Sequence, residues 1–260
     1  MAMSVADWEL QEGDAPLIAV AIHDGHQLRP EAAAATRLSE DERLREEDPY
    51  TGRLAEPAPT HLIPRRSRFE VDLNRSPESP VYLGPEQAWG LDVWHQPPTA
   101  SLLAGSMAYY DAFYAAYQSQ IERLLATHDS ILVLDLHSYN HQRGGPGAPY
   151  DDPEANPDIN LGTGTLDRSR FGAVAEIFVQ EMSKVELGGV ALDVRENVKF
   201  KGGYLARSSH ADYPGRVCAL SIEFKKIFMD EWTGILNEAH HAHLKESLWR
   251  LAPALLNALP

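Results

Sequence analysis

The sequence predicts an α/β fold with a mixed, largely parallel central sheet and helices on both faces of that sheet. Short, largely apolar runs occur at residues 17–22, 131–136 and 217–224, as expected for strands that are buried on both faces. Longer segments in which apolar residues recur at helical spacing separate these runs. The alternation of such strands with helices is typical of α/β domains.

The first half of the chain is expected to hold two strands, one helix and two loops. The run at 17–22 is the first strand, and a helix is predicted from Pro30 to about Glu46, because proline is tolerated in the first helical turn. Residues 48–66 carry four prolines and are interpreted as a loop. Residues 68–73 alternate enough to predict a second strand, and 77–99 are interpreted as another loop.

In the middle of the chain, Ser106 is the predicted N-cap of a helix that continues to about Thr127. Tyrosines recur at helical spacing along this helix, and we expect them to be core residues rather than ligands. The strand at 131–136 follows. Residues 141–165 are rich in glycine, proline and aspartate, which predicts a long functional loop.

The last part is predicted to contain helices at about 168–184 and 234–256, on either side of the strand at 217–224. Three histidines on the final helix are expected to lie at the surface: His240, His241 and His243. No internal repeat or domain boundary is evident, so residues 1–260 are expected to form a single domain.

Composition narrows the class of protein. Apolar residues make up 43% of the 260 residues, so the chain can bury a large core without a disulfide or a metal. The single cysteine, Cys218, and an acidic N-terminal segment without the pattern of a signal peptide predict a cytoplasmic protein. No apolar run approaches the about 18 residues that cross a membrane.

The formal net charge of −15 argues against nucleic acid as a partner, because binding a phosphate backbone requires a basic surface. It leaves a small anionic molecule open as a partner, since a few local arginines can hold a carboxylate. The oligomeric state is not predicted.

Polar residues follow several of the predicted strands, where ligands gather in open α/β sheets. His23 and His26 come after the first strand, and His137 comes directly after the strand at 131–136. A catalytic zinc site needs three protein ligands and one open position, and neutral imidazole is a good ligand. Asp48 competes with His26 for the remaining ligand position, and the spacing does not choose between them.

Glu223 is a charged residue inside an otherwise apolar strand. A buried carboxylate is costly unless it is paired or used, so it could pair with Lys225 or Lys226, or act as a general base beside a metal. The base is the interpretation we favour.

Arginines near residues 68–75 (RFEVDLNR) are candidates for holding a substrate. An arginine fork binds a carboxylate through two hydrogen bonds, and a second arginine can stabilise an oxyanion. Arg75 and Arg68 are predicted for these roles. The glycine-containing segment FKGGYLAR adds Lys201 and Arg207, and it matches no phosphate-binding loop.

Several segments together resemble the N-formylglutamate amidohydrolase family, which is itself similar to zinc carboxypeptidases. They occur in the family's order: RFEVDLNR (68–75), LDLHSYN (134–140), NPDINLGT (156–163), KFKGGYLAR (199–207) and ALSIEFKKIFMDE (219–231). The resemblance implies a zinc-exopeptidase-like (phosphorylase/hydrolase-like) fold and one zinc ion. It also implies that the substrate is a small-molecule N-acyl amino acid. The expected reaction is the hydrolysis of N-formyl-L-glutamate to formate and L-glutamate.

The resemblance also implies roles for residues. Asn74 and Arg75 would anchor the α-carboxylate, His137 would bind zinc, and Glu223 would be the base. In the mechanism that we expect for such a site, Arg68 stabilises the oxyanion, and Lys201 or Arg207 holds the side-chain carboxylate.

The sequence departs from the family around its first histidine. Members of the family generally carry only the first histidine of His23-Asp-Gly-His26, with a later aspartate that Asp48 could match. In addition, the segment IHDGHQLRPE differs from the Pro-His-x-Gly motif with which the corresponding segment of the family begins. Two alternatives therefore stay open: a carboxypeptidase-like or aspartoacylase-like hydrolase of another N-acyl amino acid or of a peptide, and a non-catalytic amino-acid-binding module. Iron, cobalt or manganese could replace zinc in such a site.

Overall fold

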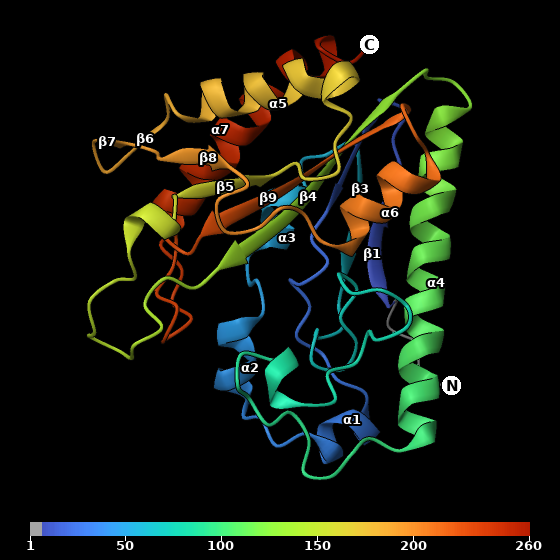
Figure 1. Cartoon of the computed structure of the whole chain (residues 1–260), viewed down its shortest axis with the longest axis vertical. Coiled ribbons are helices and arrows are strands. Elements are labelled where there is room, and N and C mark those ends of the chain that lie inside the picture. The colour runs from blue at the N-terminus through green and yellow to red at the C-terminus, as the bar shows by residue number, and fades with distance from the viewer. Residues whose placement is uncertain (1–6) are drawn as a thin grey trace.

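A computed structural model describes residues 7–260; residues 1–6, which belong to the acidic N-terminal segment, lie outside the described residues. Seven strands form one sheet in the order β1-β3-β2-β4-β9-β5-β8 (Figure 1). Their bounds are Trp8–Gln11 (β1), Leu17–Val20 (β2), Thr60–Pro64 (β3), Ile131–Tyr139 (β4), Ile159–Gly162 (β5), Val194–Glu196 (β8) and Val217–Lys225 (β9). A separate hairpin consists of β6 (Glu186–Leu187) and β7 (Val190–Ala191).

The sheet is mixed and mostly parallel, as predicted. The four central strands, β3, β2, β4 and β9, are parallel to one another, and β8 is parallel to β5. Two pairings are antiparallel: β1 with β3, and β5 with β9. The parallel central strands bring their carboxyl ends to one edge of the sheet, where ligand sites form in such folds.

Helices cover both faces of the sheet. Their bounds are Pro30–Ala35 (α1), Glu40–Glu46 (α2), Thr51–Ala55 (α3), Ala100–Leu125 (α4), Arg168–Met182 (α5), Tyr204–Asp212 (α6) and Glu238–Asn257 (α7), with short 3-10 turns at Pro85–Gln87 and Pro153–Ala155. α5 and α7 lie on one side of the sheet, and α4 and α6 lie on the other (Figure 1). No helix among residues 7–260 combines the length and the apolar character needed to span a membrane.

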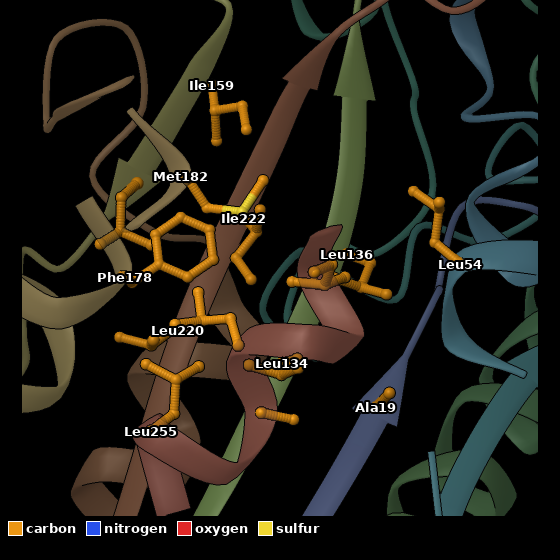
Figure 2. Close-up of a cluster of buried hydrophobic side chains, with 14 of the residues drawn as sticks. Ala19, Leu54, Leu134, Leu136, Ile159, Phe178, Met182, Leu220, Ile222 and Leu255 are labelled. Carbon is orange, nitrogen blue, oxygen red and sulfur yellow. The ribbon is translucent and has the colours of Figure 1, made fainter. Parts of the chain in front are cut away.

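Side chains of each central strand alternate between two cores, as the pleat of a strand requires. On one face, Leu134 and Leu220 pack with Phe178 of α5 and Leu255 of α7 (Figure 2). On the other face, side chains of β2 and β4 pack against the tyrosine-rich stripe of α4. The prediction that this stripe is core is confirmed. Burying each such side chain contributes about 1.5–3 kcal/mol, which holds the strand ends in place for the site.

The single helix predicted at 30–46 is wrong, because the chain forms two helices with a break after Ala35. Thr36 is extended, with φ −72° and ψ 142°. Ser39 then starts α2 through a capping box, in which its hydroxyl accepts from the Glu42 amide and the Glu42 carboxylate accepts from the Ser39 amide. The pattern Ser-x-x-Glu was present in the sequence and marks this start.

Two predictions between residues 48 and 73 are also wrong. The expected loop at 48–66 contains α3 and the central strand β3, which ends at its proline. Residues 68–73 form turns instead of a strand, with local bonds such as the Glu70 amide to the Ser67 carbonyl (3.0 Å). The polar residues 74 and 75 are therefore held by turns that follow β3.

The remaining differences concern boundaries and burial. α4 begins at Ala100, where the Thr99 hydroxyl accepts from the Leu102 amide, so Ser106 is a buried residue inside the helix and not its cap. The long segment 141–165 contains β5. On α7, His241 is fully buried and not at the surface, with Nε2 3.0 Å from the Tyr50 carbonyl oxygen.

Candidate active site

Two histidines and one aspartate meet at the carboxyl edge of the sheet. His23 follows β2, His137 lies in β4, and Asp48 follows α2; all three are buried. The two Nδ1 atoms lie 3.1 Å apart, and Asp48 Oδ2 lies 3.3 Å from His23 Nδ1 and 3.1 Å from His137 Nδ1. One potential ligand atom from each residue lies within 4.8 Å of the others, so the group could hold a metal ion.

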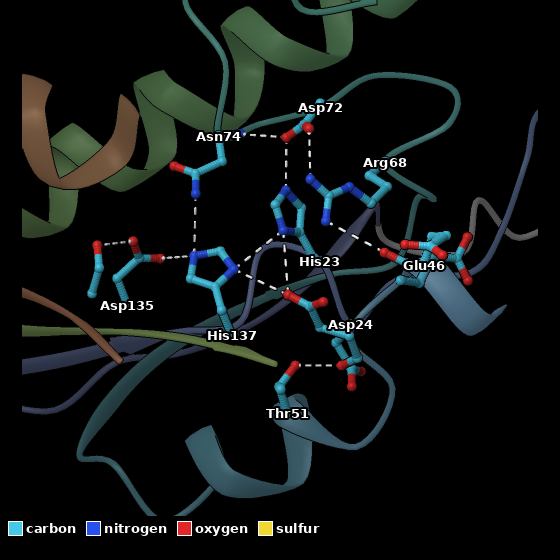
Figure 3. A network of polar contacts seen from close by, with 12 residues as sticks. His23, Asp24, Glu46, Thr51, Arg68, Asp72, Asn74, Asp135 and His137 are labelled. Atoms are coloured by element: carbon cyan, nitrogen blue, oxygen red, sulfur yellow. Dashed lines mark hydrogen bonds and ion pairs between the residues drawn. The ribbon is translucent and has the colours of Figure 1, made fainter. Parts of the chain in front are cut away.

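A carboxylate stands behind each histidine ring (Figure 3). Asp72 Oδ1 lies 2.7 Å from His23 Nε2, and Asp135 Oδ1 lies 2.9 Å from His137 Nε2. Each Nε2–H therefore donates outward, which leaves the Nδ1 lone pairs directed at one another and at Asp48. Three electron-rich atoms so close together repel unless a proton or a metal cation lies between them, and two imidazoles with one carboxylate are a donor set that fits a metal ion.

The charges of the cluster depend on these contacts. Burial alone would raise the pKa of Asp48. Without a cation in the cluster, a proton on Nδ1 makes the imidazoles donors and gives them positive charge, and their hydrogen bonds and attraction outweigh burial and lower the pKa of Asp48. The pKa of Asp72 is likewise lowered against the effect of burial, mainly by Arg68 and His23. Both carboxylates are thus ionised at neutral pH, as a metal ligand and its supporting partner must be.

Glu223 lies beside this cluster. In the register of β4 and β9 it is opposite His137, and it lines the same cavity. Burial raises the pKa of Glu223 to about 7, which suits a group that exchanges a proton near neutrality. Within residues 7–260 it makes no ion pair with either neighbouring lysine: Lys225 pairs with Asp158 at 2.7 Å, and the Lys226 ammonium donates to the carbonyls of Arg45 and Glu47.

A cavity of about 440 Å³ opens over the cluster. Arg68 and Arg75 line it together with His23, Asp48, His137 and Glu223. The Arg68 guanidinium donates to Asp72 Oδ2 (2.9 Å) and to the Tyr82 hydroxyl (3.1 Å). The Arg75 guanidinium donates only to Ser79 among the described residues, so its charge has no carboxylate partner there.

Asn74 connects the histidine to the opposite side of the cavity. Its Oδ1 accepts from the Leu205 amide at the start of α6 (3.2 Å), and its Nδ2 lies 3.3 Å from His137 Nε2. Gly203 allows this approach, because a Cβ there would stand 2.1 Å from the Asn74 amide nitrogen. The glycines of FKGGYLAR thus serve close packing against Asn74.

Three predicted site residues lie differently from the rest. His26 is not part of the group around His137: its ring pairs instead with Glu47 and Glu40. Lys201 lines the cavity with an exposed side chain. Arg207 is exposed, donates to the Gly202 carbonyl (3.1 Å) and does not line the cavity.

Sequence reasoning missed several residues of the site. Asp135 carried a signal, because it is a charged residue in an apolar strand two positions before His137 and so on the same face. The sequence signal at Asp72 is weaker, because residues 68–73 predict a strand that does not form. Three cations of the cavity wall were also missed: Arg143, Lys199 and Lys226.

The chain was compared with known proteins. A family profile described as N-formylglutamate amidohydrolase matches residues 15–229, which confirms the resemblance read from the sequence. None of the curated proteins compared with the chain is significantly similar to it.

Two solved structures share the fold. An N-formylglutamate amidohydrolase from Ralstonia eutropha JMP134 has a TM-score of 0.77 and 21% sequence identity, with 98% of both chains covered. A gene product of Agrobacterium tumefaciens has a TM-score of 0.67 and 19% identity, with 96% of this chain and 95% of that chain covered. A metallo-carboxypeptidase from Burkholderia cenocepacia, at a TM-score of 0.38 and 13% identity, is too distant to support an argument.

Proposed function

Because the chain belongs to the N-formylglutamate amidohydrolase family, we propose that it hydrolyses the amide of an N-acyl amino acid. The proposed substrate is N-formyl-L-glutamate, and the products are formate and L-glutamate. The observation that carries the proposal is the meeting of two inward-facing imidazoles with Asp48, each ring backed by its own carboxylate.

We propose that one Zn²⁺ ion is held by His23 Nδ1, Asp48 and His137 Nδ1. Two histidines and one carboxylate make a ligand set typical of catalytic zinc, with a position left for substrate or water. When bound, such a cation polarises the amide carbonyl and makes a water molecule easier to deprotonate.

Glu223 supplies the proton transfers in this proposal. Its carboxylate takes the proton of the attacking water and then gives that proton to the leaving amine, so that the C–N bond breaks with a neutral amine as product. A pKa near 7 in the cation-free site suits both steps, since the group can accept and release a proton at neutral pH.

Two arginines handle negative charge on the substrate. Arg75 binds the α-carboxylate, and its lack of a carboxylate partner among residues 7–260 supports this role. Asn74 lies next to it in the chain, and its side-chain amide contacts both the ring of His137 and the start of α6. Arg68 stabilises the oxyanion of the tetrahedral intermediate. Within residues 7–260, its Nη1 makes only one long hydrogen bond of 3.4 Å, to the Glu46 carbonyl.

The variant Glu223→Gln tests the proposal. We expect formate release from N-formyl-L-glutamate to fall by about 10²–10⁴-fold, the range for loss of a general base, with bound zinc still near one per chain. Glu176→Gln, which changes an exposed glutamate on α5, is the matched control and should keep full activity. Full activity in Glu223→Gln would refute the role of base.

A panel of substrates, consisting of N-formyl-L-glutamate, N-acetyl-L-aspartate and a dipeptide, tests which acyl group and which amino acid the protein accepts. Higher activity on N-acetyl-L-aspartate or a dipeptide than on N-formyl-L-glutamate would replace the proposed substrate while keeping the reaction class. A purified protein that binds no zinc and releases no product from any member of the panel would contradict the proposal that this protein is an enzyme.

A further inference from the structure

Lys199 is a cation of the cavity wall that the proposed mechanism does not use. Its ammonium is half-buried and donates to Asn156 Oδ1 at 2.5 Å. The ring of Tyr139 lies 5.0 Å from Nζ, and the ring of Phe200 lies 5.9 Å away. The head group is therefore fixed by a neutral amide and two aromatic rings at the surface of the cavity.

The charge of Lys199 has no counterpart within the described chain. Other cations nearby do have one: Arg143 binds Glu46 through two hydrogen bonds of 3.2 and 3.0 Å, and Lys225 pairs with Asp158. Burial, followed by repulsion from Arg143, lowers the pKa of Lys199, and the weaker attraction from Asp151, Glu223 and Glu231, none of which forms an ion pair with it in the described chain, does not offset this. A half-buried ammonium without a carboxylate is unfavourable alone and gains most from an anion that enters the cavity.

The sheet register places the backbone of Lys199 on the far side of Glu223 from His137. Glu223 is opposite His137 on β4 and opposite Asn160 on β5. The Asn160 side chain holds the next segment, because its Oδ1 accepts from the Lys199 amide (2.8 Å) and its Nδ2 donates to the Phe200 carbonyl (2.8 Å). Along the sheet edge, the backbone order is therefore His137, Glu223, Asn160 and then the segment of Lys199. The Lys199 ammonium lies over the ring of Tyr139, at the end of β4, and lines the same cavity as His137 and Glu223.

We propose that Lys199 binds the side-chain carboxylate of the substrate and makes this site selective for N-acyl amino acids that carry two carboxylates. The inference rests on the proposed function and deepens it by assigning the second carboxylate. Arg75 would hold the α-carboxylate, and the scissile amide would lie over the histidines and Glu223.

Lys199 fits this role better than the two cations predicted from the sequence. Lys201 is exposed, and its ammonium has no hydrogen bond to any residue of the described range 7–260, so binding would have to immobilise a free side chain. Arg207 lies outside the cavity. Lys199 is already held by Asn156, so a carboxylate meets a positioned donor.

The experiment compares Lys199→Met with the parent protein on N-formyl-L-glutamate and on the nearly isosteric, uncharged N-formyl-L-glutamine. We expect kcat/KM for the glutamate substrate to fall by about 10- to 100-fold, the loss that follows from removing one charge-assisted hydrogen bond. The value for the glutamine substrate should change by less than about threefold, because its amide gains little from a cation. Lys199→Arg should keep part of the preference.

Two further variants make the result specific. Lys184→Met removes an exposed lysine whose one ion pair among residues 7–260 is with Glu181, and it should leave the values for both substrates unchanged. Lys201→Met distinguishes the rival: loss of the preference there, with none in Lys199→Met, would overturn the proposal. Equal losses for both substrates in Lys199→Met would also overturn it, since they indicate a structural role.

Calorimetric binding separates this inference from the proposed function. If the parent protein hydrolyses neither compound, the proposed reaction fails, and affinity for L-glutamate against L-glutamine still tests Lys199. A preference for glutamate that disappears in Lys199→Met supports the second carboxylate site. No difference between the variants in glutamate affinity contradicts it.

Discussion

His23 and His137 each lie between a carboxylate and the candidate cation position, and the carboxylate behind the ring sets which nitrogen faces inward. The ring of His137 can therefore direct Nδ1 at a cation only while Asp135 accepts the hydrogen bond from its Nε2–H. The Asp135 carboxylate is itself fixed, because its Oδ2 accepts from the Ser221 hydroxyl at 3.0 Å.

Asp135→Asn should therefore weaken zinc binding by about 10- to 100-fold, because an amide is a poorer acceptor for the His137 ring and orients it less firmly. Competition with a chromogenic chelator measures the affinity. Asp129→Asn, an exposed aspartate before β4, is the matched control. Zinc affinity in Asp135→Asn within about threefold of the parent would contradict the supporting role of this carboxylate.

His210 gives a prediction for pH. Its Nε2 accepts from the Ala219 amide at 3.1 Å, so the neutral ring is required, and burial lowers the pKa of His210 to about 4 from 6.5. Between these values the unfolded chain binds the proton and the folded chain does not, so stability from this group is complete above pH 6.5 and falls as the pH drops towards 4. The expected loss is about 1–3 kcal/mol.

Urea unfolding at pH 7 and at pH 5 measures this loss. His210→Gln keeps an acceptor for the Ala219 amide but does not titrate, so its stability should fall less than that of the parent between the two pH values. An identical fall in both proteins would show that His210 does not contribute.

At the residue scale, the sequence could identify His23, His137 and Glu223 because each is a polar residue at the end of an apolar strand or within one. It could not choose between His26 and Asp48. The choice depends on α2, which ends next to the turn after β2, where the Asp48 amide donates to the His23 carbonyl at 2.9 Å. The spacing of residues along the chain does not show that the end of α2 lies next to the turn after β2.

At the scale of elements, the start of α6 must approach Asn74 closely. A Cβ on Gly203 would collide with the Asn74 amide at 2.1 Å. Gly203→Ala should destabilise the fold by about 1–3 kcal/mol, because one of the two segments must move. It should also weaken zinc binding, since Asn74 contacts His137.

Gly172→Ala on α5 is the control for the same chemical change. The nearest atoms to its Cβ position are 3.9 Å away, and alanine favours a helix, so stability should stay equal or rise by up to about 1 kcal/mol. Thermal unfolding of the two variants compares them directly. Equal stability of Gly203→Ala and the parent would contradict the close contact with Asn74.

The strands could be predicted from the sequence where the chain is buried on both faces of the sheet. β2, β4 and β9 are apolar on both faces and were recognised as strands from that pattern. The proline-rich stretch that contains β3 was assigned to loop because only pairing with β1 and β2 reveals the strand. Residues 68–73 carry a strand-like pattern, but side-chain contacts to Asp72 and Glu70 hold them as turns.

For the whole molecule, one seven-stranded sheet takes strands from both halves of the described chain, and the two largest cores lie on its opposite faces. We therefore propose that the chain folds as one domain. Differential scanning calorimetry should give a single transition, with equal calorimetric and van't Hoff enthalpies. Two separate transitions would contradict a single domain.

Zinc should bind to the folded protein only, because its three ligands come from segments far apart in the chain. The midpoint of thermal unfolding should therefore rise with zinc concentration. A chelator should reverse the rise, and an unchanged midpoint in saturating zinc would argue against a site formed by folding.

Anomalous diffraction at the zinc edge, from crystals of the protein grown with zinc, tests the central claim most directly. We expect one strong peak at bonding distance from His23 Nδ1, His137 Nδ1 and a carboxylate oxygen of Asp48, about 2.0–2.2 Å from each. A zinc peak bound elsewhere, with the two imidazoles still facing an empty space, would contradict the proposed metal centre and the reaction built on it.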